Sequence, residues 1–369
     1  MDIYSEKALD KNFSKLFLAA ISERIKASGN GIAMIHMTKE RMEKVIHPLP
    51  PIEEQQRIVA KVDELMNLCD VLEAQTENSI TAHQTLVEVL LEALLKAPEQ
   101  TATPEQATAQ FQQNWQRLSE HFDTLFTTTA SIDTLKQTIL QLAVMGKLVP
   151  QNPNDEPAAK LLDRIAAEKN QLIKEKKIKK QKPLPEITDE EKPFGLPNGW
   201  EWTRLQGIIQ ISSGKNLTSK NMVQDGDVPV YGGNGITGYH DTYNVSSPTL
   251  VIGRVGFYCG SVHITPNFAW VTDNAFITHF DEDRLFIEFL YWLFKGTDLS
   301  KNDSATAQPV ISGGKVYPIV VAIPPTEEQH RIVAKVDELM ALCDQLKARL
   351  TDAQTTKLHL TDAIVEQAL

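Results

Sequence analysis

Two segments of the chain share one helical pattern of apolar positions. In residues 51–72, apolar side chains recur at alternating spacings of four and three residues, which is the a/d seam of a coiled coil. The seam positions are Ile58, Val62, Leu65, Cys69 and Leu72 in the first segment, and Ile332, Val336, Leu339, Cys343 and Leu346 in the second. No Gly or Pro interrupts the first pattern before Pro98, so we predict long helices over 52–96 and 326–369.

The two segments are copies of each other. Residues 51–72 align with 325–346 at an offset of 274, and only four of the 22 positions differ. The alignment of the two copies continues without a gap to the end of the chain. We therefore predict that the chain contains the late part of one copy, followed by a second copy. A helix of this length spans about 60 Å and is too long to be buried in one small domain. We therefore expect the two helices to pack on each other as an antiparallel pair; the alternative is an amphipathic helix on each separate domain.

Between the two copies, the residue composition changes from a linker to helical segments and then to a second linker. Residues 97–110 are of low complexity and predict a linker, and residues 111–182 predict helices, one of them capped by Ser131 and stopped by Gly146. The helix predicted at 158–180 ends in a lysine run, 174–182, which is either an arm that follows phosphates or a solvated helix end. The prolines of 183–199 predict a stiff linker.

From Trp200 onward, short β-rich runs alternate with turn residues. The runs 228–231, 249–252, 268–271 and 275–280 predict strands, followed by a helix at 284–293 and a last strand near 316–323. The sequence therefore predicts an α+β fold, in which a small mixed domain is joined to long helices.

Composition narrows the class of protein. The chain has 369 residues with 42% hydrophobic and 23% charged side chains, which is typical of a globular protein. No apolar run is long enough for a membrane span, and the N-terminus lacks the pattern of a signal peptide, so we expect a cytoplasmic protein without a membrane partner. Three scattered cysteines exclude a disulfide framework and a multi-cysteine zinc site.

The sequence contains no recognisable catalytic motif. Residues 312–315 fail the phosphate-loop template, because Pro309 stands where the first Gly is required and Val316 follows the lysine. The nine histidines show no metal-ligand spacing, and Cys69 and Cys343 occupy seam positions where buried, inert thiols are expected. We therefore predict a protein that is not an enzyme and that has no catalytic residue, metal or cofactor.

The loops of residues 200–325 are rich in side chains that can read base edges or contact phosphate. This holds even though residues 200–322 carry 8 Lys and Arg against 11 Asp and Glu. The candidate DNA-binding residues are Ser213, Lys215, Asn216, Lys220, Asn221, Tyr231, Asn234, Tyr239, Arg254, Asn274, Gln308, Ser312 and Lys315. For Arg254, the alternative is an ion pair inside the domain with Asp241 or Asp273.

Three blocks of sequence give the chain a resemblance to a known family. They are the doubled segment that begins Pro-Pro-x-Glu-Glu-Gln-x-Arg-Ile-Val-Ala-Lys, residues 135–148, and residues 196–205 with the later Tyr-Gly-Gly-Asn-Gly (231–235) and Ile-Gly-Arg (252–254). In these blocks the chain resembles the specificity subunit of type I restriction–modification enzymes. The resemblance implies a subunit whose target-recognition domains each read half of a split site in double-stranded DNA.

The resemblance also implies partners. The repeated helices would form an antiparallel coiled coil that docks two methyltransferase subunits, and a restriction (translocase) subunit would join them. S-adenosylmethionine and ATP would belong to those partners. Because residues 1–50 resemble only the end of a recognition domain, we expect the first domain to be truncated, and self-association is one way to supply the missing half.

On this basis we divide the chain into seven segments. They are the remnant of a first recognition domain (1–50), a coiled-coil helix (51–96), a linker (97–110), a helical region with a basic end (111–182), a Pro-rich linker (183–199), a recognition domain (200–325) and the second coiled-coil helix (326–369). The alternative function is a coiled-coil adaptor that binds proteins without direct DNA readout.

Overall fold

The computed structural model describes residues 7–22, 45–96, 104–300 and 310–368. The chain divides into two units, Met1–Thr85 and Leu86–Leu369, and each is described by itself.

The first unit contains two helices, α1 (Lys11–Ala20) and most of α4 (Ile52–Leu95), which continues into the second unit. Asp10 caps α1, because its carboxylate accepts hydrogen bonds from the backbone N–H groups of Asn12 and Phe13. α4 follows two prolines and has two glutamates in its first turn, where they interact favourably with the helix dipole. The bounds of α4 agree closely with the helix predicted over 52–96.

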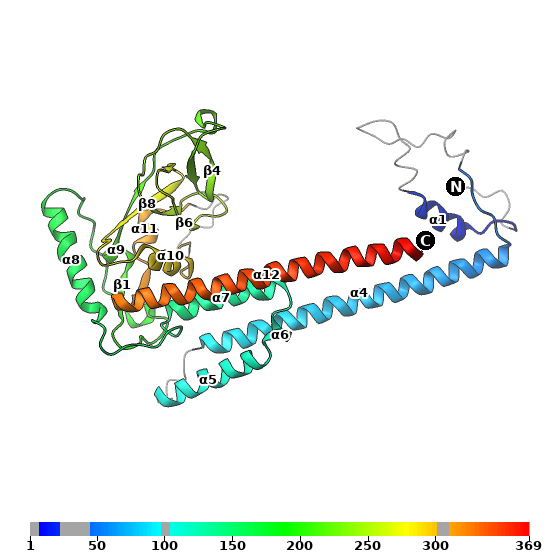
Figure 1. The fold of residues 1–369 in the computed structure, drawn as a ribbon, viewed down its shortest axis with the longest axis horizontal. Coiled ribbons are helices and arrows are strands. Elements are labelled where there is room, and N and C mark those ends of the chain that lie inside the picture. The colour runs from blue at the N-terminus through cyan, green and yellow to red at the C-terminus, as the bar shows by residue number, and fades with distance from the viewer. Residues whose placement is uncertain (1–6, 23–44, 97–103, 301–309, 369) are drawn as a thin grey trace. The chain divides into compact units, whose positions relative to one another are not determined.

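The second unit contains helices before, within and after a β-rich region (Figure 1). The helices are α5 (Pro104–Glu120), α6 (Phe122–Leu125), α7 (Thr129–Val144), α8 (Ala158–Lys174), α9 (Leu205–Ile208), α10 (Ile287–Lys295), α11 (Gly313–Val316) and α12 (Thr326–Ala368). The strands are β1 (Glu201–Arg204), β2 (Ile209–Ser213), β3 (Val228–Gly232), β4 (Gly235–His240), β5 (Leu250–Gly253), β6 (Val262–Ile264), β7 (Trp270–Val271), β8 (Ala275–Phe280) and β9 (Val320–Ile323).

The strands form three small sheets. The central sheet has four antiparallel strands in the order β2-β8-β5-β6, and a three-stranded sheet has the order β4-β3-β7, in which β3 and β7 are parallel. β1 pairs with β9, so the two ends of the β-rich region meet before the chain enters α12. The fold class expected from the sequence, α+β with long helices, is confirmed.

α12 is held in the second unit by α7 and α10. Lys136 and Asp133 of α7 pair with Asp344 and Lys347 of α12 at 2.5 and 2.7 Å, so the two helices run antiparallel. Three of the seam residues of α12, Ile332, Val336 and Cys343, are buried, and Leu339 and Leu346 are half-buried. The apolar stripe of α7 is buried as well, at Ile132, Leu135, Ile139 and Leu142.

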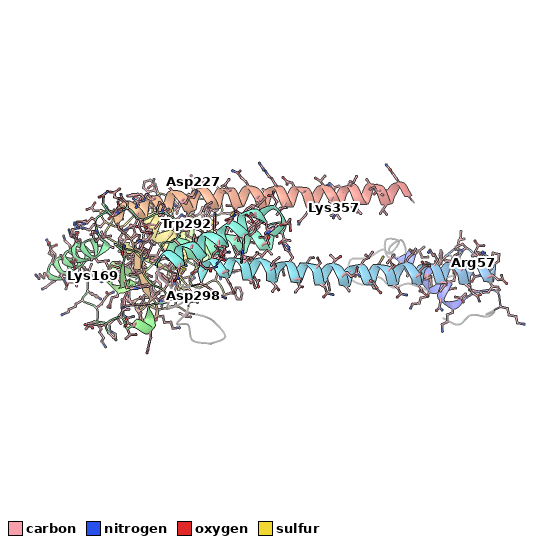
Figure 2. All side chains as sticks on the ribbon, turned by 90° about the horizontal axis from the view of Figure 1, so that it is seen from below. Arg57, Lys169, Asp227, Trp292, Asp298 and Lys357 are labelled. Carbon is pink, nitrogen blue, oxygen red and sulfur yellow. The ribbon has the colours of Figure 1, made fainter. Side chains whose placement is uncertain are left out.

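This packing corrects one expectation. We predicted that the seam of 326–369 packs on the helix at 52–96, but α7 covers the N-terminal half of that seam. Beyond residue 350 the described side chains of α12 are exposed, among them Lys357 (Figure 2). In the first unit the equivalent seam positions of α4 are exposed, except for half-buried Val62. The antiparallel pairing of the two long helices themselves stays a prediction.

Three element boundaries also differ from the sequence prediction: the start of α5, the end of α8 and the N-cap of α7. α5 begins at Pro104, so the described end of the predicted linker 97–110 is helical. α8 ends at Lys174, because Lys176 adopts a left-handed conformation with φ of 58° and the N–H of Lys177 closes the helix on the carbonyl of Leu172. Most of the lysine run 174–182 therefore lies beyond the helix. α7 is capped by Thr128, and Ser131 completes a capping box three residues later.

Arg204 fastens the Pro-rich segment 183–199 to the β-rich region. Its guanidinium donates to the carbonyl oxygens of Pro185 and Pro318 and pairs with Glu191 at 2.9 Å. The hydrogen bonds that Glu191 accepts from the guanidinium of Arg204 and from the backbone N–H of Thr188 lower its pKa to about 2. These contacts hold the part of the segment from Pro185 to Glu191 against β1 and against the residues just before β9.

The buried seam makes a stability prediction that uses the repeat as its control. Val336→Asp places a charge in the fully buried interface of α7, α10 and α12, and we expect it to lower the free energy of unfolding by about 3 kcal/mol. Val62→Asp changes the equivalent, half-buried position of the first unit. All five tryptophans lie in the second unit, so urea unfolding followed by tryptophan fluorescence should shift for Val336→Asp and remain unchanged for Val62→Asp. Equal shifts would contradict the assigned packing.

Glu328, in the first turn of α12, generates a prediction on pH. It is buried, and burial raises the pKa of its carboxyl although Gln151 donates a hydrogen bond to it at 3.3 Å. Above the ordinary glutamate pKa of about 4.3, the folded state therefore holds more protons than the unfolded state, and stability falls as pH rises through the raised folded pKa. Glu328→Gln should flatten this fall at pH values above the ordinary glutamate pKa of about 4.3, measured by urea unfolding. Glu54→Gln at the exposed, repeat-equivalent position is the control, and an unflattened profile in Glu328→Gln would refute the assignment.

Candidate nucleic-acid interface

One end of the central sheet collects several of the predicted DNA-binding residues. In the antiparallel register, Ser213 at the end of β2 faces Phe276 of β8, and Gly253 at the end of β5 faces Ala275. The loops that follow β2 and β5, and the turn that precedes β8, therefore leave the sheet at the same end. Lys215, Arg254 and Asn274 lie on these three segments.

Backbone hydrogen bonds hold the segments together. The N–H of Arg254 donates to the carbonyl of Asn274 at 2.8 Å, and the N–H of Lys215 donates to the carbonyl of Val271 at 2.9 Å. The N–H of Ile311 donates to the carbonyl of Arg254 at 2.9 Å, which brings the start of α11 to the same place. Ser213, Lys215, Arg254, Asn274, Ser312 and Lys315 thus belong to one surface, which we call the loop edge.

Glycines bring Asn234 to the loop edge. A Cβ atom on Gly253 would lie 2.1 Å from the carbonyl oxygen of Gly233, and a Cβ atom on Gly233 would lie 2.6 Å from the carbonyl oxygen of Val255. Only glycine permits this approach of the turn between β3 and β4 to the end of β5. The hydroxyl of Ser261 donates to the carbonyl of Gly233 at 2.9 Å and fixes the turn. Asn234 at the tip is exposed.

Five cations of the domain fall into two groups, according to whether a carboxylate pairs with them. Arg204 and Arg284 are neutralised by carboxylates, since Arg204 pairs with Glu191 and Arg284 pairs with Glu168. In contrast, Lys215, Lys220 and Arg254 form no ion pair with any residue that the structure describes. Lys215 and Arg254 of the loop edge therefore have no carboxylate partner among the described residues.

Arg254 is the most informative of these cations. The carbon at the centre of its guanidinium lies 5.3 Å from the centroid of the Phe276 ring, a cation–π contact. Its Nε atom is buried and has no hydrogen-bond partner among the described residues. The alternative that Arg254 pairs with Asp241 or Asp273 is not what the structure shows. The guanidinium therefore packs on the ring of Phe276, and its Nε–H makes no hydrogen bond to a described residue.

The remaining predicted residues lie in different environments. Asn216, Lys220 and Asn221 are exposed on the segment after β2, and Tyr239 is exposed on β4. The ammonium of Lys315 donates to the carbonyl of Val310 at 2.9 Å. Gln308 lies outside the described residues.

Tyr231 requires a correction. Its side chain is only 7% exposed in a small core with Val251, Ala269, Val271 and Ala275, and burial raises the pKa of its phenol. A ring that is packed in this core is part of the support for the loop edge, so we withdraw it as a candidate DNA contact.

Two aromatic residues at the loop edge are not among the candidates predicted from the sequence. Phe257 is 87% exposed and Tyr258 is 57% exposed, and their rings touch edge-on with centroids 5.1 Å apart. They lie just after Arg254, in the β5–β6 turn, between Gly256 and Gly260, both of which have positive φ. The segment Gly-Phe-Tyr-Cys-Gly could have indicated these exposed aromatic residues in the sequence. In a short turn bounded by glycines, few neighbouring side chains can bury a large aromatic ring.

Among the described residues, no group of three His, Cys, Asp or Glu side chains could hold a metal ion. No helix in the same part of the chain combines the length and apolarity needed to cross a membrane.

The chain is similar to a family model, to curated relatives and to solved structures. Residues 3–82 and 197–353 match the model of the type I restriction modification DNA specificity domain. Two Escherichia coli proteins, the specificity subunits of the type I restriction enzymes EcoAI and EcoEI, are 40% identical over 364 and 353 residues. Each match covers 87% of this chain but 58% of the relative, so the chain spans less than two thirds of the length of these curated relatives.

A solved structure supports the fold. A chain from a study of complex assembly and conformational transition in the type I R-M system aligns over 94% of this chain and 67% of its own length, with a TM-score of 0.51 and 19% identity. The resemblance drawn from the sequence blocks is thus confirmed by independent comparisons. Because the family model covers more than half of its residues, the chain belongs to the family of the type I restriction modification DNA specificity domain.

Proposed function

We propose that the chain is the DNA-specificity component of a type I restriction–modification complex and reads a half-site through the loop edge of residues 200–325. The observation that carries this proposal is the set of unneutralised cations, Arg254 and Lys215, held beside Asn234 and Asn274 by backbone contacts. Family membership supports the proposal, because the family model that matches the chain is that of a DNA specificity domain.

The side chains of the loop edge suit different parts of a DNA duplex. A guanidinium can donate two hydrogen bonds to guanine, and asparagine can pair with adenine in the same groove. Lysine at the end of a turn contacts phosphate as a point charge, which adds affinity but little base preference. The exposed Phe257 can wedge between base steps or stack on a base. In this arrangement Arg254 and the asparagines specify the sequence, while Lys215 positions the duplex.

The helices would serve assembly. The C-terminal half of α12 is exposed and carries apolar residues such as Leu358 and Ile364. We propose that such helical surfaces dock two methyltransferase subunits, with which a restriction subunit associates. Methylation, ATP hydrolysis and cleavage then belong to those partners, and this chain contributes no catalytic group.

A mobility-shift assay with the purified methyltransferase partner tests the proposal. Selection from a randomised duplex pool should enrich one short sequence for the complex of chain and methyltransferase, and no sequence for methyltransferase alone. Complex formation without sequence enrichment would overturn the proposal and favour a protein-interaction adaptor.

Arg254 and Lys215 should fail in different ways. Arg254→Ala should cost about 1–3 kcal/mol on the selected site and relax one base position. Lys215→Ala should weaken binding to all sequences alike and reduce the salt slope by about one. Lys160→Ala, an exposed change on α8, is the control for loss of charge alone. Competition between half-site variants measures both effects, and unchanged base preference in Arg254→Ala would refute its reading role.

Phe257 should contribute to affinity but not to folding. Because its side chain is 87% exposed, Phe257→Ala should leave the thermal unfolding temperature unchanged. DNA affinity should fall about tenfold, within the range of one base–aromatic stacking contact. Phe268→Ala, at a half-exposed aromatic whose ring packs on Tyr243, is the matched control. Equal loss of affinity in both variants would contradict a specific contact by Phe257.

A further inference from the structure

Residues 174–182 are a strongly basic segment in an acidic protein, and we call them the basic turn. They contain six lysines and one glutamate, whereas the whole chain has a net charge of −11. α8 ends at Lys174, so the other five lysines follow the helix. A helix dipole acts on cations in the last turn of the helix, so it accounts for Lys174 but not for Lys179, Lys180 and Lys182. A solvated helix end therefore does not explain the basic turn.

Backbone hydrogen bonds fix the conformation of the basic turn. Lys176 has a left-handed conformation with φ of 58°. The N–H groups of Lys176 and Lys177 donate to the carbonyls of Ile173 and Leu172 at 3.0 and 2.9 Å. Such hydrogen bonds close the end of a helix and redirect the chain. Figure 1 shows the chain turning back from the end of α8 toward α9.

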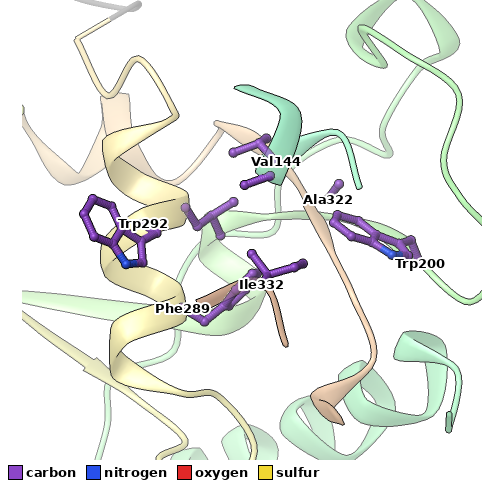
Figure 3. Close-up of a pocket in the computed structure, with 8 residues that line it drawn as sticks. Val144, Trp200, Phe289, Trp292, Ala322 and Ile332 are labelled. Atoms are coloured by element: carbon purple, nitrogen blue, oxygen red, sulfur yellow. The ribbon is translucent and has the colours of Figure 1, made fainter. Parts of the chain in front are cut away.

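The start of α8 is fixed to the core of the second unit. The N–H of Ala158 donates to the carbonyl of Gly199 at 2.8 Å. The next residue, Trp200, lines a small apolar pocket together with residues of α7, α10 and α12 (Figure 3). Leu161 and Ile165 of α8 are buried as well. The helix that carries the basic turn is therefore a packed part of the second unit.

Gln206 of α9 holds the two sides of the basic turn near the central sheet. The ammonium of Lys169, on α8, donates to the carbonyl of Gln206, and the side-chain amide of Gln206 donates to the carbonyl of Lys182 at 2.9 Å. Gln206 lies just before β2, which is an edge strand of the central sheet, and Lys215 of the loop edge lies just after β2. β2 has five residues and spans about 17 Å, at about 3.4 Å per residue. The basic turn and the loop edge are thus attached at opposite ends of one edge strand.

Most of the charge in the basic turn is not neutralised. Lys177 pairs with Glu175 at 2.8 Å. The other five lysines of the turn are exposed and form no ion pair with any residue that the structure describes. Like charges this close repel one another, so a polyanion beside the turn lowers the free energy of the system.

The residue types of the basic turn favour phosphate over a protein surface. All six cations are lysines, and the apolar residue among them, Ile178, is half-buried. A lysine ammonium is a compact point charge that contacts phosphate without a fixed orientation. Protein interfaces are instead enriched in arginine and aromatic residues and depleted of lysine.

We propose that the basic turn contacts phosphates of the duplex whose half-site the loop edge reads, outside the bases that the loop edge contacts. This proposal rests on the proposed function. The length of β2 corresponds to about five base pairs, since phosphates of one strand follow each other at about 3.4 Å along the helix axis. Contacts at this distance add affinity but no base preference.

The salt dependence of DNA binding tests the proposal on the full chain with its methyltransferase partner. The probes are a labelled duplex with the selected site and a scrambled duplex, measured by fluorescence anisotropy at several salt concentrations. Lys179→Gln with Lys180→Gln should reduce the salt slope by about two and weaken binding to both duplexes by the same factor. Lys160→Gln with Lys15→Gln removes two exposed charges elsewhere and should leave the slope unchanged.

A second variant should act in the opposite direction, which a folding defect would not do. Glu175→Gln releases Lys177 from its ion pair, so the salt slope should increase by about one and both duplexes should bind more tightly. Glu120→Gln, an exposed change on α5, is the control for the loss of a negative charge.

Base preference and salt slope are separate readouts, so the two proposals can fail independently. Slopes that change as expected on duplexes between which the unmodified complex shows no preference would support the phosphate contact and refute the half-site reading. Slopes that stay unchanged in both the lysine variant and Glu175→Gln would overturn the phosphate contact. Weaker binding of the methyltransferase without DNA, together with an unchanged slope, would also overturn it and identify a protein surface as the ligand.

Discussion

The burial of the α12 seam under α7 is the interaction on which the second unit depends. α7 precedes the β-rich region in sequence and α12 follows it, so their antiparallel packing joins the two ends of that region. The β1–β9 pair makes the same closure at the level of the sheet. Neither connection involves the loops that follow β2 and β5, which belong to the loop edge.

The sequence was most informative where a pattern is long or repeated. A seam of identical apolar residues over 22 aligned positions predicted both long helices, and β8 has the predicted bounds of 275–280. Helix ends set by single residues were less predictable. Lys176 is left-handed without being glycine, and no local pattern distinguishes Thr128 from Ser131 as the cap of α7. The partner of a seam was not predictable either, since apolar spacing shows which face is buried but not which helix covers it.

The site divides in the same way. Residue type and turn context made Lys215, Asn234, Arg254 and Asn274 candidates, and their DNA-binding role stays a prediction. Their convergence depends on strand register, which the sequence does not reveal. Tyr231 was misjudged because the same aromatic ring serves a core and a DNA contact equally well, and only burial separates these uses. Phe257 was missed for the converse reason: an aromatic residue in a β-rich region suggests core until the structure shows it 87% exposed.

The loop edge is held by main-chain groups. Arg254, Lys215 and Asn274 are located by their own N–H and carbonyl groups, and the turn at Gly233 is located by glycine contacts and by Ser261. The side chains that face outward contribute little to this frame. In the proposed function, a surface with this construction can exchange its side chains one at a time while the backbone stays fixed. New recognition properties can therefore arise by substitution alone, without a loss of stability that further mutations would have to offset.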